Sequence, residues 1–148
     1  MDGIAIAYDR PITFGRAGNA RTLNSRGIDF EEDGDHSWTC ESTAELDIPL
    51  PLFQRNIALK IAASPFLVPD TLRSQQVFVF INSLFVGCIS LDGFATNEFR
   101  LARLPISEQE IHLALAIPTA ISPKKLGIGN DMRKLGIYLS SVEFSLSQ

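Results

Sequence analysis

Cysteine is scarce in this sequence: among 148 residues there are only Cys40 and Cys88. Two cysteines are too few for a disulfide framework, and no CxxC or Cys/His spacing accompanies them that would hold a metal. We therefore interpret both as reduced thiols of the core. We expect no metal site and no cofactor.

Long hydrophobic runs are also lacking. The apolar runs are far shorter than the ~20 residues that a transmembrane helix needs. The segment Met1–Tyr8 has no basic region and no long apolar region, so it does not have the pattern of a secretory signal. We therefore expect no membrane insertion and a cytoplasmic location.

Positive charge is in deficit. The chain has 13 Lys and Arg residues against 17 Asp and Glu residues, a net charge of −4. Nucleic acids and anionic membranes both select a basic surface. The composition therefore argues against either as the main partner.

Helical periodicity and internal repeats are absent as well, whereas alternating apolar runs recur between turn-forming residues. Ile57, Leu59 and Ile61 share one face of a half-buried strand. Residues 77–81 are apolar on both faces, as expected of a central strand covered on each side, and a tight turn at 82–83 would pair them with residues 84–89. Further runs lie at residues 12–14, 44–48, 98–101, 111–117 and 135–146.

This pattern predicts an all-β fold. We expect a two-sheet antiparallel β-sandwich, jelly-roll-like, with about eight strands in a single domain over residues 1–148. The apolar positions change parity at Ser140-Ser141, which predicts a β-bulge or bend there. Residues 15–37, 65–74 and 118–134 do not fit strands and are expected to be loops, where binding residues usually lie.

Catalytic signatures are lacking. Nucleophilic catalysis needs a Ser, Cys or Thr beside a base, and the only histidines are His36, in an acidic loop, and His112, in a predicted strand. No GxSxG motif accompanies them. We therefore expect a protein that is not an enzyme, with a solvated His36 and with His112 on a strand face.

The acidic residues between 31 and 35 could supply oxygen ligands for calcium, with Gly34 allowing a sharp turn. They do not match the EF-hand pattern, so a solvated acidic loop is the favoured interpretation. The glycine-containing stretch 15–19 lacks the spacing and the Lys-Ser/Thr ending of a phosphate-binding loop, and it predicts a turn.

Two groups of residues are candidates for ligand binding. Trp38, the only tryptophan, could stack on a sugar while Glu32, Asn19 or Asp35 bind its hydroxyls. The favoured alternative is a core tryptophan that seals one end of the sandwich, with most of its ring buried and one edge exposed. The second group is Asp131 and Arg133, which point the same way in an extended segment and could form an ion pair. We favour a structural clamp over ligand binding for this pair.

One motif resembles a known family. Residues 121–137 read SP-x-x-LG followed by D-x-R-x-LGI. This resembles a bacterial accessory domain that is attached to glycosyltransferases and phosphoglycerol transferases of cell-surface polysaccharide synthesis. The resemblance extends over nearly the whole chain, through Phe14-Gly15, Gly18-Asn19, Gly27, Glu32, Trp38-Thr39, Ala44, Leu46, Pro65-Phe66, Gln76-Val77, Asn82 and Pro105.

The resemblance implies a non-catalytic β-sandwich similar to a carbohydrate-binding module. Its recurrent polar features would be the Glu32/Trp38 segment and the Asp131/Arg133 segment. The chain departs from the family at Ile28, where an aromatic residue is common, and near Glu41, where a glycine is expected. No transferase domain accompanies this sequence, so the resemblance implies either an excised piece or a module that acts in trans.

The main prediction is a module that binds a glycan or a glycosyltransferase partner. Two alternatives belong to other classes. One is a structural domain that forms a homo-oligomer through an apolar sandwich face. The other is a small sugar-active enzyme, which would need a pair of acids at a suitable separation, and no spacing singles out such a pair.

Overall fold

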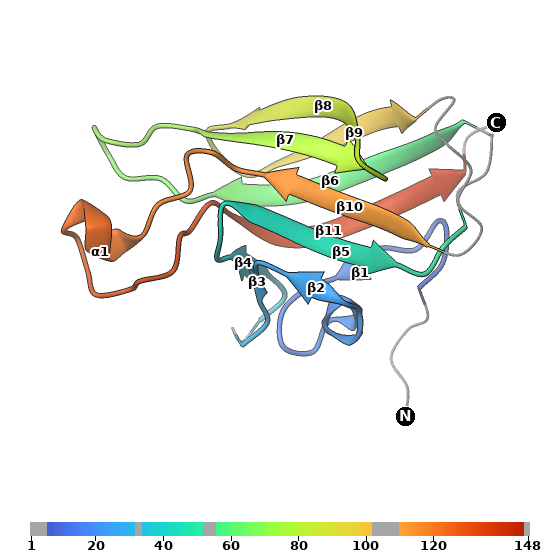
Figure 1. Cartoon of the computed structure of the whole chain (residues 1–148), viewed down its shortest axis with the longest axis horizontal. Coiled ribbons are helices and arrows are strands. Elements are labelled where there is room, and N and C mark those ends of the chain that lie inside the picture. Colours follow the sequence, from blue (N-terminus) through green and yellow to red (C-terminus); the bar gives the residue numbers. More distant parts are fainter. Residues whose placement is uncertain (1–5, 32–33, 52–55, 102–109, 147–148) are drawn as a thin grey trace.

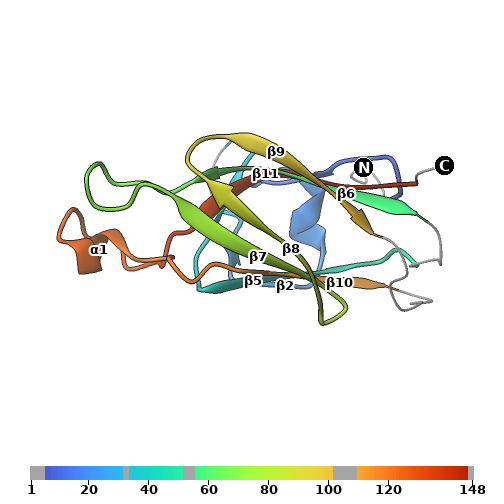
Figure 2. The same cartoon turned by 90° about the horizontal axis from the view of Figure 1, so that it is seen from above.

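The computed structural model describes residues 6–31, 34–51, 56–101 and 110–146. Its strands form two antiparallel sheets that pack face to face as a β-sandwich (Figures 1 and 2). No helix in the described ranges is long and apolar enough to cross a membrane. The strands are β1 (Ile12–Thr13), β2 (Ser25–Arg26), β3 (Ile28–Asp29), β4 (Ser37–Thr39), β5 (Thr43–Ile48), β6 (Ile57–Pro65), β7 (Gln75–Ile81), β8 (Leu84–Leu91), β9 (Ala95–Leu101), β10 (Ile111–Ala116) and β11 (Ile137–Leu146).

The strand order distinguishes the two sheets. Sheet A has the order β3-β4-β11-β6-β9, and β1 also pairs with β11. Sheet B has the order β2-β5-β10-β7-β8. Two short helices complete the described elements, the 3-10 helix η1 (Asn19–Thr22) and α1 (Pro123–Leu126). The predicted two-sheet antiparallel sandwich is confirmed.

The expected count of about eight strands is wrong, because the described residues contain eleven. The additional strands, β2, β3 and β4, lie in or at the end of the stretch 15–37 that we expected to be a loop. Each has only two or three residues, so no period can be recognised in the sequence. They form through pairing with longer partners, β2 with β5 and β4 with β11.

The core lies between the sheets, where inward residues alternate along each strand. Ile57, Leu59 and Ile61 of β6 face it, as their spacing predicts, and are almost fully buried. The expectation that residues 77–81 are covered on both faces is wrong. Phe78 and Phe80 lie on the outer face of sheet B and are only half-buried, because no layer covers that face within the described chain.

Two local predictions are confirmed. Asn82 and Ser83 both have positive φ, 48° and 71°, and join β7 to β8 in the hairpin that the sequence indicates. The ladder between β11 and β6 shifts register between Leu139 and Ser141, so Ser140 is the extra residue of a bulge. The bulge keeps Leu139 and Val142 both in the core.

Two connections extend from the same end of the sandwich, at the left in both views (Figures 1 and 2). One joins β6 to β7, and the other joins β10 to β11 and carries α1. The second is held by an isolated bridge between Ile121 and Leu135. A second contact holds the 131–134 segment beside β3 and β4. The backbone N–H of Lys134 donates to the Cys40 carbonyl at 3.3 Å.

Candidate functional site

A polar pocket lies where the 131–134 segment meets the chain around β3 and the end of β4. Its volume is about 630 Å³, within the range of about 300–1,000 Å³ that ligand sites occupy. Charged side chains of both signs line it together with apolar ones. The lining residues are Arg21, Ile28, Asp29, Phe30, Glu31, Cys40, Glu41, Met132, Arg133 and Lys134.

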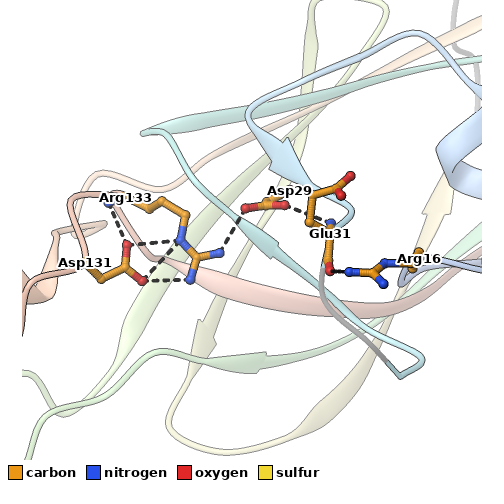
Figure 3. Close-up of polar contacts among 5 residues, drawn as sticks. All are labelled: Arg16, Asp29, Glu31, Asp131 and Arg133. Carbon is orange, nitrogen blue, oxygen red and sulfur yellow. Dashed lines mark hydrogen bonds and ion pairs between the residues drawn. The ribbon is translucent and has the colours of Figure 1, made fainter.

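Arg133 is the centre of the hydrogen-bond network at this pocket (Figure 3). Its Nε lies 3.1 Å from both carboxylate oxygens of Asp131, and Nη2 donates to Oδ2 at 2.7 Å. Its backbone N–H donates to Asp131 Oδ1 at 2.9 Å. A further donor, Nη1, reaches Asp29 Oδ2 at 3.0 Å, across 104 residues of sequence. Such fork-like contacts fix both position and orientation.

These contacts shift the acid–base properties of the pair. Hydrogen bonds from the Arg133 side chain and backbone lower the pKa of Asp131 below its usual value. Hydrogen bonding to Asp131 raises the pKa of Arg133 further above its already high value. Both groups are therefore charged at neutral pH, and the pair is fixed in place before any ligand arrives.

Asp29 links this network to the acidic loop. The carboxylate accepts from Arg133 through Oδ2 and from the backbone N–H of Glu31 through Oδ1, at 2.9 Å. The Glu31 side chain forms an ion pair with Arg21 at 3.3 Å, and its carbonyl accepts from Arg16 Nη2 at 2.6 Å. Figure 3 shows the Asp131–Arg133–Asp29–Glu31–Arg16 series. No motif in the sequence indicates Asp29 or the Arg21–Glu31 pair as part of a site.

Trp38 lies next to Asp29 on the outer face of sheet A. Cross-strand pairing places Asp29, Trp38, Tyr138 and Ser64 in one row. The Trp38 ring is half-buried, with its centroid 4.8 Å from that of Tyr138 and 6.1 Å from that of Phe66, edge to face in both cases. The partial exposure agrees with the expected free edge of the ring, but the ring lies on the outer face of sheet A and not between the sheets. Ser37 and Thr39 of β4 point inward instead and are fully buried.

The remaining predicted site residues have different surroundings. Asn19 is buried, and its Oδ1 accepts from the backbone N–H of Thr13 at 2.8 Å, so it holds the turn after β1 together. Glu32 lies outside the described residues. Asp35 is exposed at the end of the acidic loop, with His36 Nδ1 3.7 Å from its carboxylate. The structure therefore brings Trp38, Asp131 and Arg133 to one region, through Asp29, and leaves Asn19 out of it.

The acidic loop carries no recognisable metal cluster in its described part. Among the residues that the structure describes, no group of three or more His, Cys, Asp or Glu side chains is arranged to hold a metal ion. Glu31 is tied to Arg21 and exposed, and Asp35 extends into solvent. Residues 32–33, which the calcium alternative also needs, lie outside the described ranges.

His112 lies in a second charged group, on the outer face of sheet B. Its Nδ1 is 2.7 Å from Asp47 and its Nε2 is 2.9 Å from Glu45. Glu45 also pairs with Arg26, whose hydrogen bond is the largest cause of a lowered pKa for Glu45. His112 thus lies on a strand face, as predicted. Within the described ranges, no Ser, Thr or Cys side chain is hydrogen-bonded to it as a nucleophile would be.

The two thiols are free, but the prediction that both are core residues is wrong, since Cys88 is exposed and Cys40 is only half-buried. Cys88 lies on the exposed outer face of β8 and pairs across the ladder with Phe78. Cys40 is half-buried at the polar pocket, where burial is the main cause of its raised pKa. A raised pKa leaves less of the thiolate, the reactive form of cysteine.

Comparisons with known proteins bear on the fold. No family model matches the chain, and no curated protein matches its sequence. Among solved structures, a xylan-binding module, CBM15, superposes with a TM-score of 0.56 and 11% identity over 94% of this chain and 97% of the module. A family 35 carbohydrate-binding module from Clostridium thermocellum gives 0.53 and 8% identity over 93% of this chain and 99% of its own.

A third similar structure is CsCBM6-3 from Clostridium stercorarium, described in complex with cellobiose. It gives a TM-score of 0.51 and 9% identity over 99% of this chain and 100% of the module. At such low identities the likeness concerns the fold alone. The chain has the β-sandwich fold that these carbohydrate-binding modules share.

Proposed function

We propose that the chain is a non-catalytic module that binds a glycan at the polar pocket. The observation that carries this proposal is the pocket itself, in which Arg133 and Asp29 are fixed by each other and by Asp131 beside the exposed Arg21–Glu31 pair. Sugar hydroxyls are both donors and acceptors. Carboxylate and guanidinium groups held at fixed positions can bind neighbouring hydroxyls without a large ordering cost.

The apolar lining supports the same function. Ile28, Phe30 and Met132 provide surface for the C–H groups of a sugar ring, and Phe30 is held by parallel stacking on the buried Phe14 at 6.3 Å. Mixed apolar and polar lining is typical of small-molecule sites. The shared fold with solved carbohydrate-binding modules favours this ligand class over others.

The biological setting is part of the proposal. The motif in residues 121–137 contains both Asp131 and Arg133, and it resembles accessory domains of bacterial surface-polysaccharide transferases. We therefore propose that the module positions a glycan, or a glycosyltransferase partner, during synthesis of such a polymer. Its contribution would be binding and orientation, with the bond chemistry supplied by the partner.

Binding to a panel of immobilised surface polysaccharides tests this function. Arg21→Ala should weaken binding about tenfold, the usual effect of removing a hydrogen bond to a charged group. The matched control is Arg26→Ala, which removes an exposed arginine from the Arg26–Glu45 pair on sheet B, a second Arg–Glu pair that does not line the pocket. Because Trp38 lies beside Asp29 in the cross-strand row, its fluorescence provides a second readout.

Two results would contradict the proposal. One is that no polysaccharide in the panel binds the parent protein. The other is that Arg21→Ala and Arg26→Ala weaken binding equally, since the effect would then come from the loss of any surface cation. Turnover of a glycan that disappears on mutation of two acids would instead establish the sugar-active enzyme.

A second candidate, the oligomerisation domain, is favoured by one observation. Phe85 is 58% exposed and Leu84 is 44% exposed, next to the half-buried Phe78 and Phe80 on the outer face of sheet B. Pairing of two copies through this face would cover these rings. A mass in solution of one chain for the parent protein would exclude it, and a dimer that Phe85→Ser dissociates would support it.

A further inference from the structure

A second pocket, the end pocket, adjoins the polar pocket, because Met132 and Lys134 line both. It has a volume of about 560 Å³ and lies at the end of the sandwich where the β6–β7 and β10–β11 connections extend together (Figure 2). Ser42, Thr71, Lys125 and Lys134 supply polar groups to it. Its apolar walls include Leu72, Pro118, Ala120, Ile121 and Leu126.

The charges of the two pockets differ. The polar pocket has both signs, whereas Lys125 and Lys134 are the only ionisable side chains among the described residues that line the end pocket. Neither ammonium group has an ion pair with a described carboxylate. Two carboxylates of the same connections are paired elsewhere, Asp131 with Arg133 and Asp70 with Arg73 at 3.4 Å. A pocket with two cations and no carboxylate complements an anion.

The apolar walls of the end pocket restrict the class of ligand more than its two positive charges do. A bare inorganic ion would use the lysines and hydroxyls but not the apolar walls. A sugar unit that carries an acidic group would use both, with its C–H groups against Leu72 and Leu126 and its anion near Lys125. General attraction of anions does not explain such binding, because the whole chain has a net charge of −4.

We infer that the end pocket is a subsite for an acidic sugar unit, bearing a carboxylate, phosphate or sulfate group, of the glycan that the polar pocket binds. The inference rests on the proposed function in one respect: the sugar unit in the end pocket and the sugar unit in the polar pocket belong to the same polysaccharide. Because Met132 and Lys134 line both pockets, neighbouring units of a polymer can occupy them together. The module would then select charged polymers over neutral ones of the same backbone.

Titration with single sugars tests the subsite by itself. The probes are glucuronate, glucose 6-phosphate and glucose 6-sulfate, with glucose and inorganic phosphate as references, followed by the amide NMR shifts of the end-pocket residues. We expect saturable shifts with at least one acidic sugar, weaker at high salt, and little response to glucose. The acidic sugar that binds most tightly identifies the anionic group.

Neighbouring lysines provide the matched variants. Lys125→Gln should weaken binding of the acidic sugar about tenfold, as for loss of a charge-assisted hydrogen bond. Lys124→Gln removes the same charge from the same turn of α1 at a residue that does not line the end pocket, and it should leave the affinity unchanged. Equal effects of the two variants would overturn the subsite.

Other outcomes overturn it as well. Binding of inorganic phosphate as tight as that of glucose 6-phosphate would mean that the apolar walls contribute nothing. Equal response to glucose and glucuronate would remove the role of charge. The result is separate from the test of the polar pocket: if acidic sugars bind here while Arg21→Ala has no effect on polysaccharide binding, the proposed function fails and the anionic subsite remains.

Discussion

At the scale of single residues, the Asp131–Arg133 pair links the fold to the proposed site. Its two side chains are each 31% exposed, so water partly screens the pair. We predict that Asp131→Ala lowers the free energy of unfolding by about 1–3 kcal/mol, because Nε and Nη2 of Arg133 lose their acceptor while Nη1 keeps Asp29. This is below the ~3–5 kcal/mol expected for a deeply buried pair. Urea denaturation measures it, with Asp92→Ala, at an exposed turn, as the control.

The pH dependence of that effect has a definite sign. Arg133 lowers the pKa of Asp131 in the folded state, so the ionised carboxylate stabilises the fold. The contribution is complete above the unfolded aspartate pKa of about 3.9 and is lost as the pH falls through the lower folded pKa. The stability difference between the parent and Asp131→Asn should therefore be constant near neutral pH and shrink below about pH 4. A difference that grows on acidification would contradict the pairing.

Residue-level prediction from sequence succeeds where the partner is near in the chain. Asp131 and Arg133 are two residues apart, and extended geometry alone suggests that they meet. Asp29 could not be found in this way, since its contact with Arg133 spans 104 residues. The sequence also does not indicate that Trp38 points outward, because a strand of three residues is too short to show which positions face the core.

At the scale of elements, the bulge in β11 shifts the register of its pairing with β6, so that Leu139 before Ser140 and Val142 after it both face the core. Deletion of Ser140 would join Leu139 directly to Ser141 and invert the direction of every side chain on one side of the junction. Val142 and Phe144, both buried, would then point out of the core, or Ile137 and Leu139 would. We predict that the deletion variant does not fold cooperatively, as measured by circular dichroism during denaturation.

The control for this deletion keeps the number of residues. Ser140→Ala should change the free energy of unfolding by only about 0.5 kcal/mol, the usual scale for a half-exposed substitution away from specific contacts. A deletion variant as stable as Ser140→Ala would show that β11 can slip in register and that the bulge is not required.

A strand can be predicted from the sequence only if it is long enough to show an alternating pattern. The long strands β6, β7 and β11 carry enough alternating positions for their inward faces to be recognised, and the parity change at Ser140-Ser141 predicted the bulge. The apolar pattern of residues 77–81 predicts a strand covered on both faces, and this prediction fails because the pattern requires a second layer. In sheet B the outer rings of Phe78 and Phe80 face no such layer within the described chain.

At the scale of the whole molecule, the sandwich follows from the sequence but the pockets do not. Alternating patterns between turns restrict the fold class, since each sheet must bury one face. The polar pocket needs β3, the end of β4 and the 131–134 segment to meet, and the end pocket needs two separate connections. The packing of these segments against one another depends on tertiary contacts between residues far apart in the chain, which a single sequence does not reveal.

The last prediction concerns the proposal that the chain is one domain. Both sheets bury their inner faces in one core, so neither can keep its stability once the other unfolds. Trp38 reports on sheet A, and Phe80→Trp combined with Trp38→Phe moves the single tryptophan to the outer face of sheet B. We expect the two proteins to give fluorescence denaturation curves that each coincide with their own circular dichroism curve. A fluorescence midpoint separated from the circular dichroism midpoint in either protein would mean that one sheet unfolds before the other, and the chain would not be one cooperative unit.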